Sequence, residues 1–141
     1  MIKQSNEGKK QIVLGDNQVV KLTGKETNGQ FLLIEQEDSP GVCIPMHIHH
    51  NEDETFKVIQ GELKITIGQQ TQILKSGDIA FCPRGIPHSW EVVGSKKMKS
   101  ILLITPSGLE PMFEELSLLD KFPPNFTKVA SIAKKYDIDF V

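Results

Sequence analysis

Three of the four histidines in this chain of 141 residues fall within a window of four positions, just before an acidic run. His47 and His49 are two positions apart, so on a β-strand their side chains project from the same face. Glu54 follows five positions later, and His88 returns downstream behind a turn rich in glycine and proline. Imidazole and carboxylate groups are preferred ligands of divalent transition metals. The spacing therefore predicts that His47, His49, Glu54 and His88 converge on one metal ion.

Three neutral imidazoles and one carboxylate suit Fe(II), Mn(II), Ni(II), Cu(II) or Zn(II), and the ligand types do not choose among these metals. An octahedral ion held by four protein ligands keeps positions open for substrate, water or dioxygen, which is the mark of a catalytic rather than a structural site. The expected cofactor is one divalent transition metal. Because ligating imidazoles must be neutral, we expect metal affinity to fall below about pH 6.

Other polar residues lie near this pattern without an assigned role. His50 adjoins His49 and is expected on the opposite face of the strand, where it faces solvent or supports a ligand from behind. Glu52 and Asp53 are expected in the loop before Glu54. Arg84, the only arginine, stands on the turn before His88 and either holds an anionic substrate or has a structural role. The roles of His50 and Arg84 stay open at this stage.

The elements that would position these residues are short alternating segments separated by turns. The strand candidates are residues 30–37, 55–59, 62–67, 71–74, 79–82, 88–93 and 98–105. Many short strands at even spacing predict a sandwich or barrel. Gln60-Gly61 is expected to close a hairpin between the second and third candidates. Pro83 and Pro87 bracket a bend that brings His88 back toward the face carrying His47 and His49.

The pattern changes to a helical period after Pro106. Ser107 and Glu110 fit a capping box at the start of a helix. Two apolar stripes follow, one of Leu109, Met112, Phe113, Leu116 and Leu119 and one of Phe126, Val129, Ile132, Ala133 and Tyr136, separated by Pro123-Pro124. We expect both stripes to pack on the exterior of the barrel or across a dimer.

The residues around the histidines also resemble a known family. Gly41-x5-His47-x-His49-x4-Glu54-x6-Gly61 resembles the first cupin motif at every fixed position, and Gly77-x5-Pro83-x-Gly85-x2-His88 resembles the second. The second motif usually ends in asparagine, where this chain has Val92. The tail after Pro106 is similar to that of small cupins described as quercetin-dioxygenase-like.

The resemblance implies an all-β fold, the cupin double-stranded β-helix or jelly-roll barrel, with one or two C-terminal helices. The barrel would cover about residues 12–105 and the helical extension about residues 106–141, so that residues 1–141 form a single cupin domain. It also implies that Glu54 either stays a metal ligand or takes a proton from the substrate as a catalytic residue. Many cupins are dimers, so a homodimer is expected.

Strand alternation nominates residues that would line a substrate pocket beside the metal. They are Cys43, which shares the parity of His47, Phe56 and Val58, which share that of Glu54, and Trp90 and Val92, which share that of His88. Such a pocket is mostly apolar with one wide ring, and it suits a small aromatic or apolar organic molecule. Simple packing in the barrel core is an equal alternative for these residues.

The composition excludes several classes of function. The net charge is −2, so no basic surface argues for nucleic acid. The N-terminal residues contain no apolar signal core, and no run is long enough to cross a bilayer, so we expect a cytoplasmic protein without a membrane partner. Cys43 and Cys82 are then expected as thiols.

Three classes of function stay open. The resemblance to cupin dioxygenases predicts an oxidoreductase that acts on a small organic substrate and dioxygen. The same ligands would also serve a non-redox isomerase, lyase or cyclase, in which the metal acts as a Lewis acid. The third class is a small-molecule binding or sensing module without catalysis, and fold alone does not decide among them.

Overall fold

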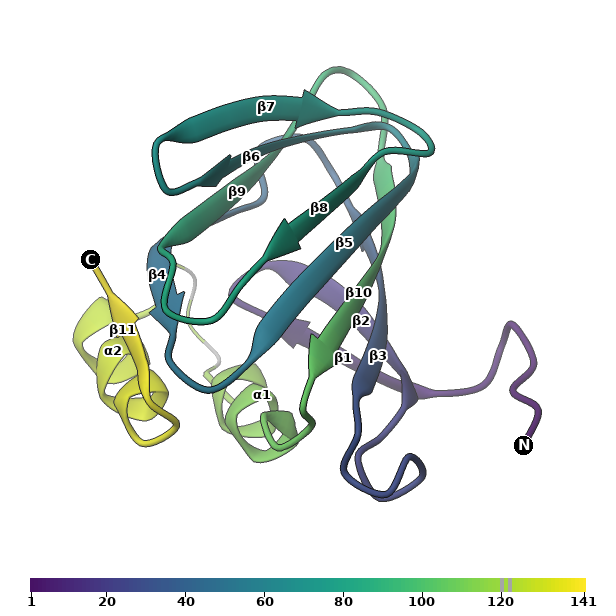
Figure 1. Cartoon of the computed structure of the whole chain (residues 1–141), viewed down its shortest axis with the longest axis vertical. Helices are drawn as coiled ribbons and strands as arrows, with labels where there is room; N and C mark the ends of the chain where they lie inside the picture. The colour runs from purple at the N-terminus through teal and green to yellow at the C-terminus, as the bar shows by residue number, and fades with distance from the viewer. Residues whose placement is uncertain (120, 122) are drawn as a thin grey trace.

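Two antiparallel β-sheets face each other in the computed structural model, which describes residues 1–119, 121 and 123–141 (Figure 1). The six-stranded sheet has the order β1 (Lys9–Val13), β2 (Asp16–Leu22), β3 (Leu32–Asp38), β10 (Met98–Thr105), β5 (Asp53–Gln60) and β8 (Ile79–Cys82). The five-stranded sheet has the order β11 (Ile138–Phe140), β4 (Cys43–His49), β9 (His88–Val93), β6 (Glu62–Ile67) and β7 (Gln70–Leu74). The predicted all-β jelly-roll barrel with C-terminal helices is therefore confirmed.

Alternation of apolar and polar residues explains how the sheets pack. In β10, Met98, Ser100, Leu102 and Ile104 are buried, whereas the residues between them are half-buried or exposed. Side chains from the inner faces of both sheets meet in this way and form the core. The sequence-based bounds of β9 and β10 are confirmed to the residue.

The hairpin predicted at Gln60-Gly61 is wrong. β5 pairs with β10 and β8, whereas β6 pairs with β9 and β7, so the chain crosses from one sheet to the other at this turn. Gly61 has the expected positive φ of 77°, and a Cβ atom there would lie 2.7 Å from the carbonyl oxygen of Lys97. A corner and a hairpin need the same glycine, so the local sequence does not distinguish them.

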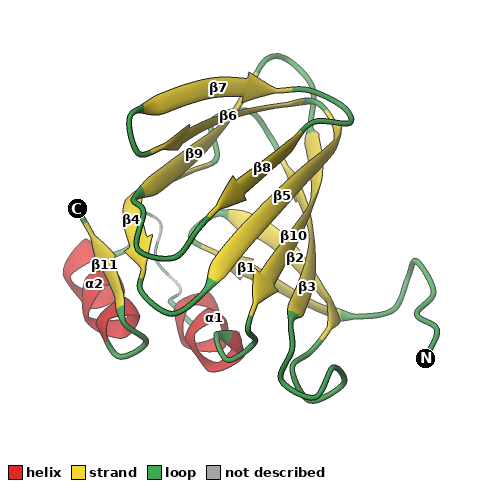
Figure 2. Cartoon of the chain, in the orientation of Figure 1, coloured by secondary structure: helices red, strands yellow, loops and turns green. Residues whose placement is uncertain are grey.

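Two helices follow the barrel in the described part of the chain, α1 (Glu110–Ser117) and α2 (Phe126–Lys134) (Figure 2). The capping box predicted for the first is wrong, because Leu109 is the N-cap residue and makes no side-chain cap. Glu110 is instead the first helical residue, and its carboxylate accepts hydrogen bonds from the backbone N–H groups of Gly108 at 2.9 Å and Gly24 at 3.0 Å. This contact ties the helix to the loop after β2.

The position predicted for the helices also needs correction. The two apolar stripes are helical and their central members are buried, as expected. They do not simply cover the outside of a sheet, because Met112, Phe113, Leu116 and Ala133 line a cavity at one end of the barrel. The chain then returns as β11, which pairs with β4 beside the histidines, so the C-terminal segment closes that end.

Both cysteines are free thiols within the described residues, as predicted. Cys43 is exposed on β4, whereas Cys82 is buried on β8 in the other sheet. Burial raises the pKa of the Cys82 thiol, which keeps it protonated and unreactive. No helix in the described ranges is long and apolar enough to span a membrane.

Candidate metal centre

The structure brings together the four residues that the spacing predicts as ligands. His47 and His49 lie on β4, Glu54 lies near the start of β5, and His88 is the first residue of β9. His47 and His88 are direct partners in the β4–β9 ladder. All four side chains are buried, and one ligand atom from each lies within 4.8 Å of the others. Three strands from both sheets thus deliver three imidazoles and one carboxylate to one point.

The distances fit a common ion. His49 Nε2 lies 3.1 Å from Glu54 Oε1, and His88 Nε2 lies 3.3 Å from Glu54 Oε2. The ring centroids of His47 and His88 are 4.3 Å apart, and those of His47 and His49 are 5.0 Å apart. Two ligand atoms that each lie about 2.1 Å from an ion, at a right angle, are about 3 Å apart. The donor set therefore fits one divalent metal ion.

Contacts behind the rings orient the histidines. His47 Nδ1 donates a hydrogen bond of 2.8 Å to the carbonyl oxygen of Pro45, which leaves the lone pair of Nε2 for a metal. His49 Nδ1 lies 3.4 Å from Glu52 Oε1, an ion-pair distance without hydrogen-bond geometry, and Nε2 is the nitrogen turned toward Glu54. A ligating histidine commonly has its other nitrogen held by a carbonyl or a carboxylate in this way.

Glu52 contacts a candidate ligand, a role that differs from the proton donor or acceptor for which the sequence made it a candidate. It was expected in the loop, and it does lie between β4 and β5, but its side chain is buried against His49. Its position three residues after His49 was the available signal. A buried carboxylate without another partner is costly, so its place beside a metal-binding ring is informative.

The electrostatics of the cluster favour metal binding. Burial, together with the neighbouring His88, lowers the pKa of His47 to about 4. Burial alone would raise the pKa of Glu54, but His49 and His88 hold it at about 2. Burial alone would lower the pKa of His49, but Glu54 and Glu52 together raise it. Near pH 7, Glu54 is thus ionised and His47 is neutral, as ligation requires.

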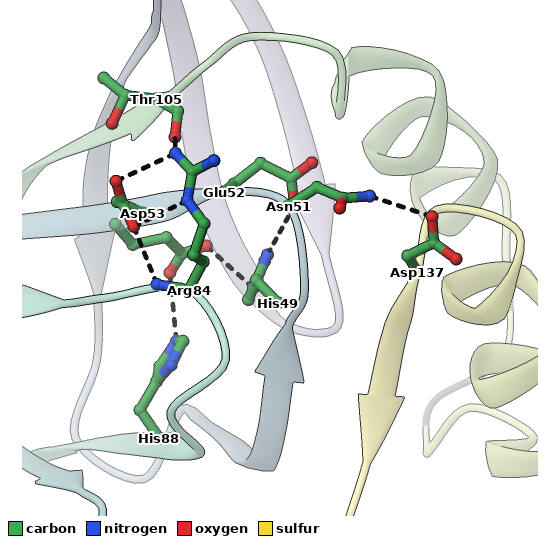
Figure 3. Close-up of polar contacts among 9 residues, drawn as sticks. His49, Asn51, Glu52, Asp53, Arg84, His88, Thr105 and Asp137 are labelled. Carbon is green, nitrogen blue, oxygen red and sulfur yellow. Dashed lines mark hydrogen bonds and ion pairs between the residues drawn. The ribbon is translucent and has the colours of Figure 1, made fainter.

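The neighbouring charged residues have partners of their own. His50 is exposed, and its Nε2 lies 2.9 Å from Asp139 Oδ2, on the face away from the cluster. Arg84 binds Asp53 through Nε at 3.2 Å and Nη2 at 3.1 Å, and it also donates to the carbonyl oxygen of Thr105 (Figure 3). These contacts favour the structural interpretation of Arg84, which fastens the turn before His88 to the start of β5 and the end of β10.

A cavity of about 60 Å³ adjoins the cluster. His47, His49 and Glu54 line it on one side, and Trp90 supplies the wide ring that the alternation predicts. The walls are otherwise largely apolar, and several come from α1, α2 and β11. The candidate metal centre therefore borders a small, largely apolar pocket.

The other predicted pocket residues do not line this cavity. Phe56, Val58 and Val92 face the barrel interior but belong to the fully buried core, which was the alternative for them. Cys43 is exposed, so its assignment to the pocket is wrong. Between Ile44 and His47, β4 takes three steps where β9 takes two, and this bulge reverses the facing of the residues before it.

Sequence reasoning also missed a polar group in the cavity wall. Asp16 and Gln18 on β2 and Gln36 on β3 line the cavity together with the candidate ligands. All three are buried. In the sequence, these three polar residues occupy alternate strand positions, in step with the apolar residues that point inward. An exposed strand face also has polar residues at alternate positions, so the sequence did not distinguish the two cases.

Comparisons with known proteins agree with this architecture. Residues 34–104 match the family model of the cupin domain, and the chain belongs to the cupin family. A quercetin 2,3-dioxygenase of Bacillus subtilis is 29% identical over 89 residues, which are 63% of this chain and 26% of that enzyme. The chain thus matches about a quarter of the length of this curated relative.

Solved structures share the fold. A predicted oxalate decarboxylase of Thermotoga maritima superposes with a TM-score of 0.69 at 21% identity, over 75% of this chain and 99% of that one. The polyketide cyclase RemF of Streptomyces resistomycificus gives a TM-score of 0.61 at 23% identity, over 75% of this chain and 80% of that one. At these identities the likeness concerns the fold and leaves the reaction open.

Proposed function

We propose that this cupin binds one divalent transition metal through His47, His49, Glu54 and His88 and acts as a dioxygenase on a small organic substrate. The observation that carries the proposal is the convergence of three imidazoles and one carboxylate at the wall of a small, largely apolar pocket. The partial likeness to a quercetin 2,3-dioxygenase supports the choice of reaction.

The bound metal would supply open coordination positions and redox chemistry for substrate and dioxygen. The residues of the chain do the remaining work. His47 and His49 are oriented by Pro45 and Glu52. Glu54 is ionised among the three histidines, and a carboxylate oxygen that does not bind the metal would be the group that accepts a substrate proton. The aromatic and aliphatic walls exclude bulk water from the reacting atoms.

The size of the cavity limits the substrate. A space of about 60 Å³ holds a few water molecules or a correspondingly small compound. Pockets for drug-sized ligands are typically about 300 Å³ or larger. The substrate is therefore small, or the cover formed by α1, α2 and β11 moves aside to admit it.

Oxygen consumption with defined metals tests the proposal. Protein prepared without metal would be reconstituted with Fe(II), Mn(II), Ni(II), Cu(II) or Zn(II) and screened with small organic compounds in an oxygen electrode. We expect uptake that depends on both the substrate and a redox-active metal, and none with Zn(II). Turnover that continues without oxygen and with Zn(II) would contradict the dioxygenase.

One observation favours a second candidate, a non-redox isomerase, lyase or cyclase. Such an enzyme needs a proton donor or acceptor in the cavity besides the metal ligands. Asp16 lines the cavity, and burial together with Asp38 raises the pKa of its carboxyl well above the ordinary value. Oxygen-independent turnover that is lost in Asp16→Asn would establish this alternative, and ligand binding without any turnover would indicate a sensing module.

A further inference from the structure

The cavity has a second polar region besides the candidate metal centre. Asp16 and Gln18 on β2 lie beside Gln36 and Asp38 on β3, and Gln18 and Gln36 are direct partners in the ladder. Their exposed fractions are 3%, 4%, 2% and 0%, so the group is as deeply buried as the ligands themselves. Buried polar groups of this kind need partners or a function.

Hydrogen bonds organise this region around one carboxyl group. Asp16 Oδ2 accepts from the Nε2 atoms of Gln18 and Gln36, each at 2.8 Å. Behind them, Gln18 Oε1 accepts from Gln11 and Gln36 Oε1 accepts from Ser100, also at 2.8 Å. The side-chain amides of Gln18 and Gln36 each have two N–H groups. One of the two donates to Asp16, and the other remains for a further acceptor.

Two carboxyl oxygens in the region receive no amide or hydroxyl donor. Asp16 Oδ1 and Asp38 Oδ2 are buried and accept no N–H group from the described residues, and the two carboxyl side chains contact each other. Burial and the neighbouring Asp38 raise the pKa of the Asp16 carboxyl group well above its ordinary value, which favours the neutral form of that group. A neutral carboxyl group both donates and accepts, and it suits a neutral oxygen group better than a cation.

The two polar regions share one space. Asp16, Gln18 and Gln36 line the same cavity as His47, His49 and Glu54. The remaining lining residues are apolar or aromatic, namely Val13, Leu14, Ile44, Trp90, Leu102, Met112, Phe113, Leu116, Ala133, Ile138 and Phe140. In an apolar pocket, a few placed polar groups fix the orientation of the ligand.

We propose that Asp16, Gln18 and Gln36 form a second substrate subsite, which binds a hydroxyl or carbonyl oxygen at the end of the substrate remote from the metal. This inference rests on the proposed metal site. It defines the substrate class as a small compound with an apolar middle, a metal-binding oxygen group at one end and a neutral oxygen group at the other. The three residues act by positioning the substrate.

Matched hydroxamates test the subsite, because a hydroxamate group binds divalent metals. The protein would be loaded with Co(II), whose visible spectrum reports binding at the metal. Each probe would be one of a pair of equal size that ends in either a methyl or a hydroxyl group, beginning with propanohydroxamic and glycolohydroxamic acid and lengthening by one carbon at a time. We expect one hydroxyl-ended probe to bind about tenfold more tightly than its methyl-ended twin.

Variants assign the preference to these residues. Asp16→Leu and Gln18→Leu should bring the ratio of the two dissociation constants to one or below, with Co(II) uptake unchanged. Gln11→Leu is the matched control, since Gln11 belongs to the same network but does not line the cavity, and it should keep the preference. Asp16→Asn, which retains a donor and an acceptor, should keep part of it.

The outcomes separate the subsite from the metal site. If wild-type protein takes up Co(II) normally but prefers no hydroxyl-ended probe of any chain length, the subsite is overturned and the metal site is not. This outcome needs no variant, so it holds even if the variants do not fold. A preference that survives both leucine substitutions would overturn it as well. Wild-type protein that takes up no Co(II) would overturn the metal site, and the subsite with it, before any probe is added.

Discussion

Two polar regions face one cavity in this protein, and they are held in opposite ways. In the metal centre, His47 and His49 are each oriented from behind and present an unshared nitrogen, while Glu54 is ionised. In the second region, Asp16 accepts hydrogen bonds from two amide groups, and burial raises the pKa of its carboxyl group. The first arrangement suits a cation and the second a neutral oxygen group, and this difference is the basis of the proposal that the two regions bind opposite ends of one substrate.

The largest expected effect is the loss of a ligand. His49→Ala should reduce the metal bound per chain from near one to near zero, because a buried three-ligand site with an open face binds far more weakly. Elemental analysis of purified protein measures this. His50→Ala is the matched control, since the neighbouring histidine is exposed and bonded to Asp139. A stoichiometric metal content in His49→Ala would refute the ligand role.

A smaller loss of metal affinity is expected when Glu52, which contacts the ring of His49, is changed. Glu52→Gln should weaken metal affinity by about 10–100-fold, as is usual when a residue that orients a ligating histidine is changed. Competition with a chelator of known affinity measures the change. Glu114→Gln, an exposed substitution of the same type, should have no effect. Equal affinities of Glu52→Gln and wild type would show that the contact at 3.4 Å does not orient the ring.

The pH dependence of metal affinity tests the candidate metal centre separately from the region around Asp16. A raised pKa means that His49 begins to bind a proton above pH 6.5, and protonated imidazole cannot ligate. Affinity should therefore fall about tenfold per pH unit below the pKa of His49, and more steeply near pH 4, where His47 also titrates. Titrations between pH 4 and 8 measure this slope. A constant affinity over that range would contradict ligation by histidine.

The smallest expected effect concerns stability in the second region. The pKa of Asp16 is raised in the folded state, so the folded protein holds its proton more tightly than the unfolded chain does. The associated stability is present in full below about pH 4 and is lost as pH rises through the folded pKa, by at most about 1.4 kcal/mol per pH unit.

Asp16→Asn removes this titration. Relative to the variant, wild-type protein should become less stable as pH rises above about 4, which urea unfolding at several pH values would measure. Parallel pH profiles of the two proteins would show that Asp16 is already ionised in the folded state. The neutral character assigned to the second region would then be wrong.

The same contrast explains what the sequence allowed us to predict. The candidate metal ligands lie in a short segment and after a turn, and strand alternation alone brings His47 and His49 to one face. β9 and β10 were located to the residue because their alternation is regular. The metal centre was therefore predictable from local spacing.

The rest depends on contacts between distant segments. One extra residue in β4 turned Cys43 outward, and the glycine at position 61 fits a corner as well as a hairpin. The apolar stripes of α1 and α2 identify helices but not the surface they cover, and β11 has only three residues. Asp16 resembles an exposed polar residue until the structure places it in the cavity.

The most direct test of the central claim is a crystal structure with bound metal, with anomalous diffraction recorded at the absorption edge of that metal. We predict one strong anomalous peak within about 2.0–2.3 Å of the Nε2 atoms of His47, His49 and His88 and of a Glu54 carboxylate oxygen. A peak held by other residues, or none at a saturating metal concentration, would contradict the account.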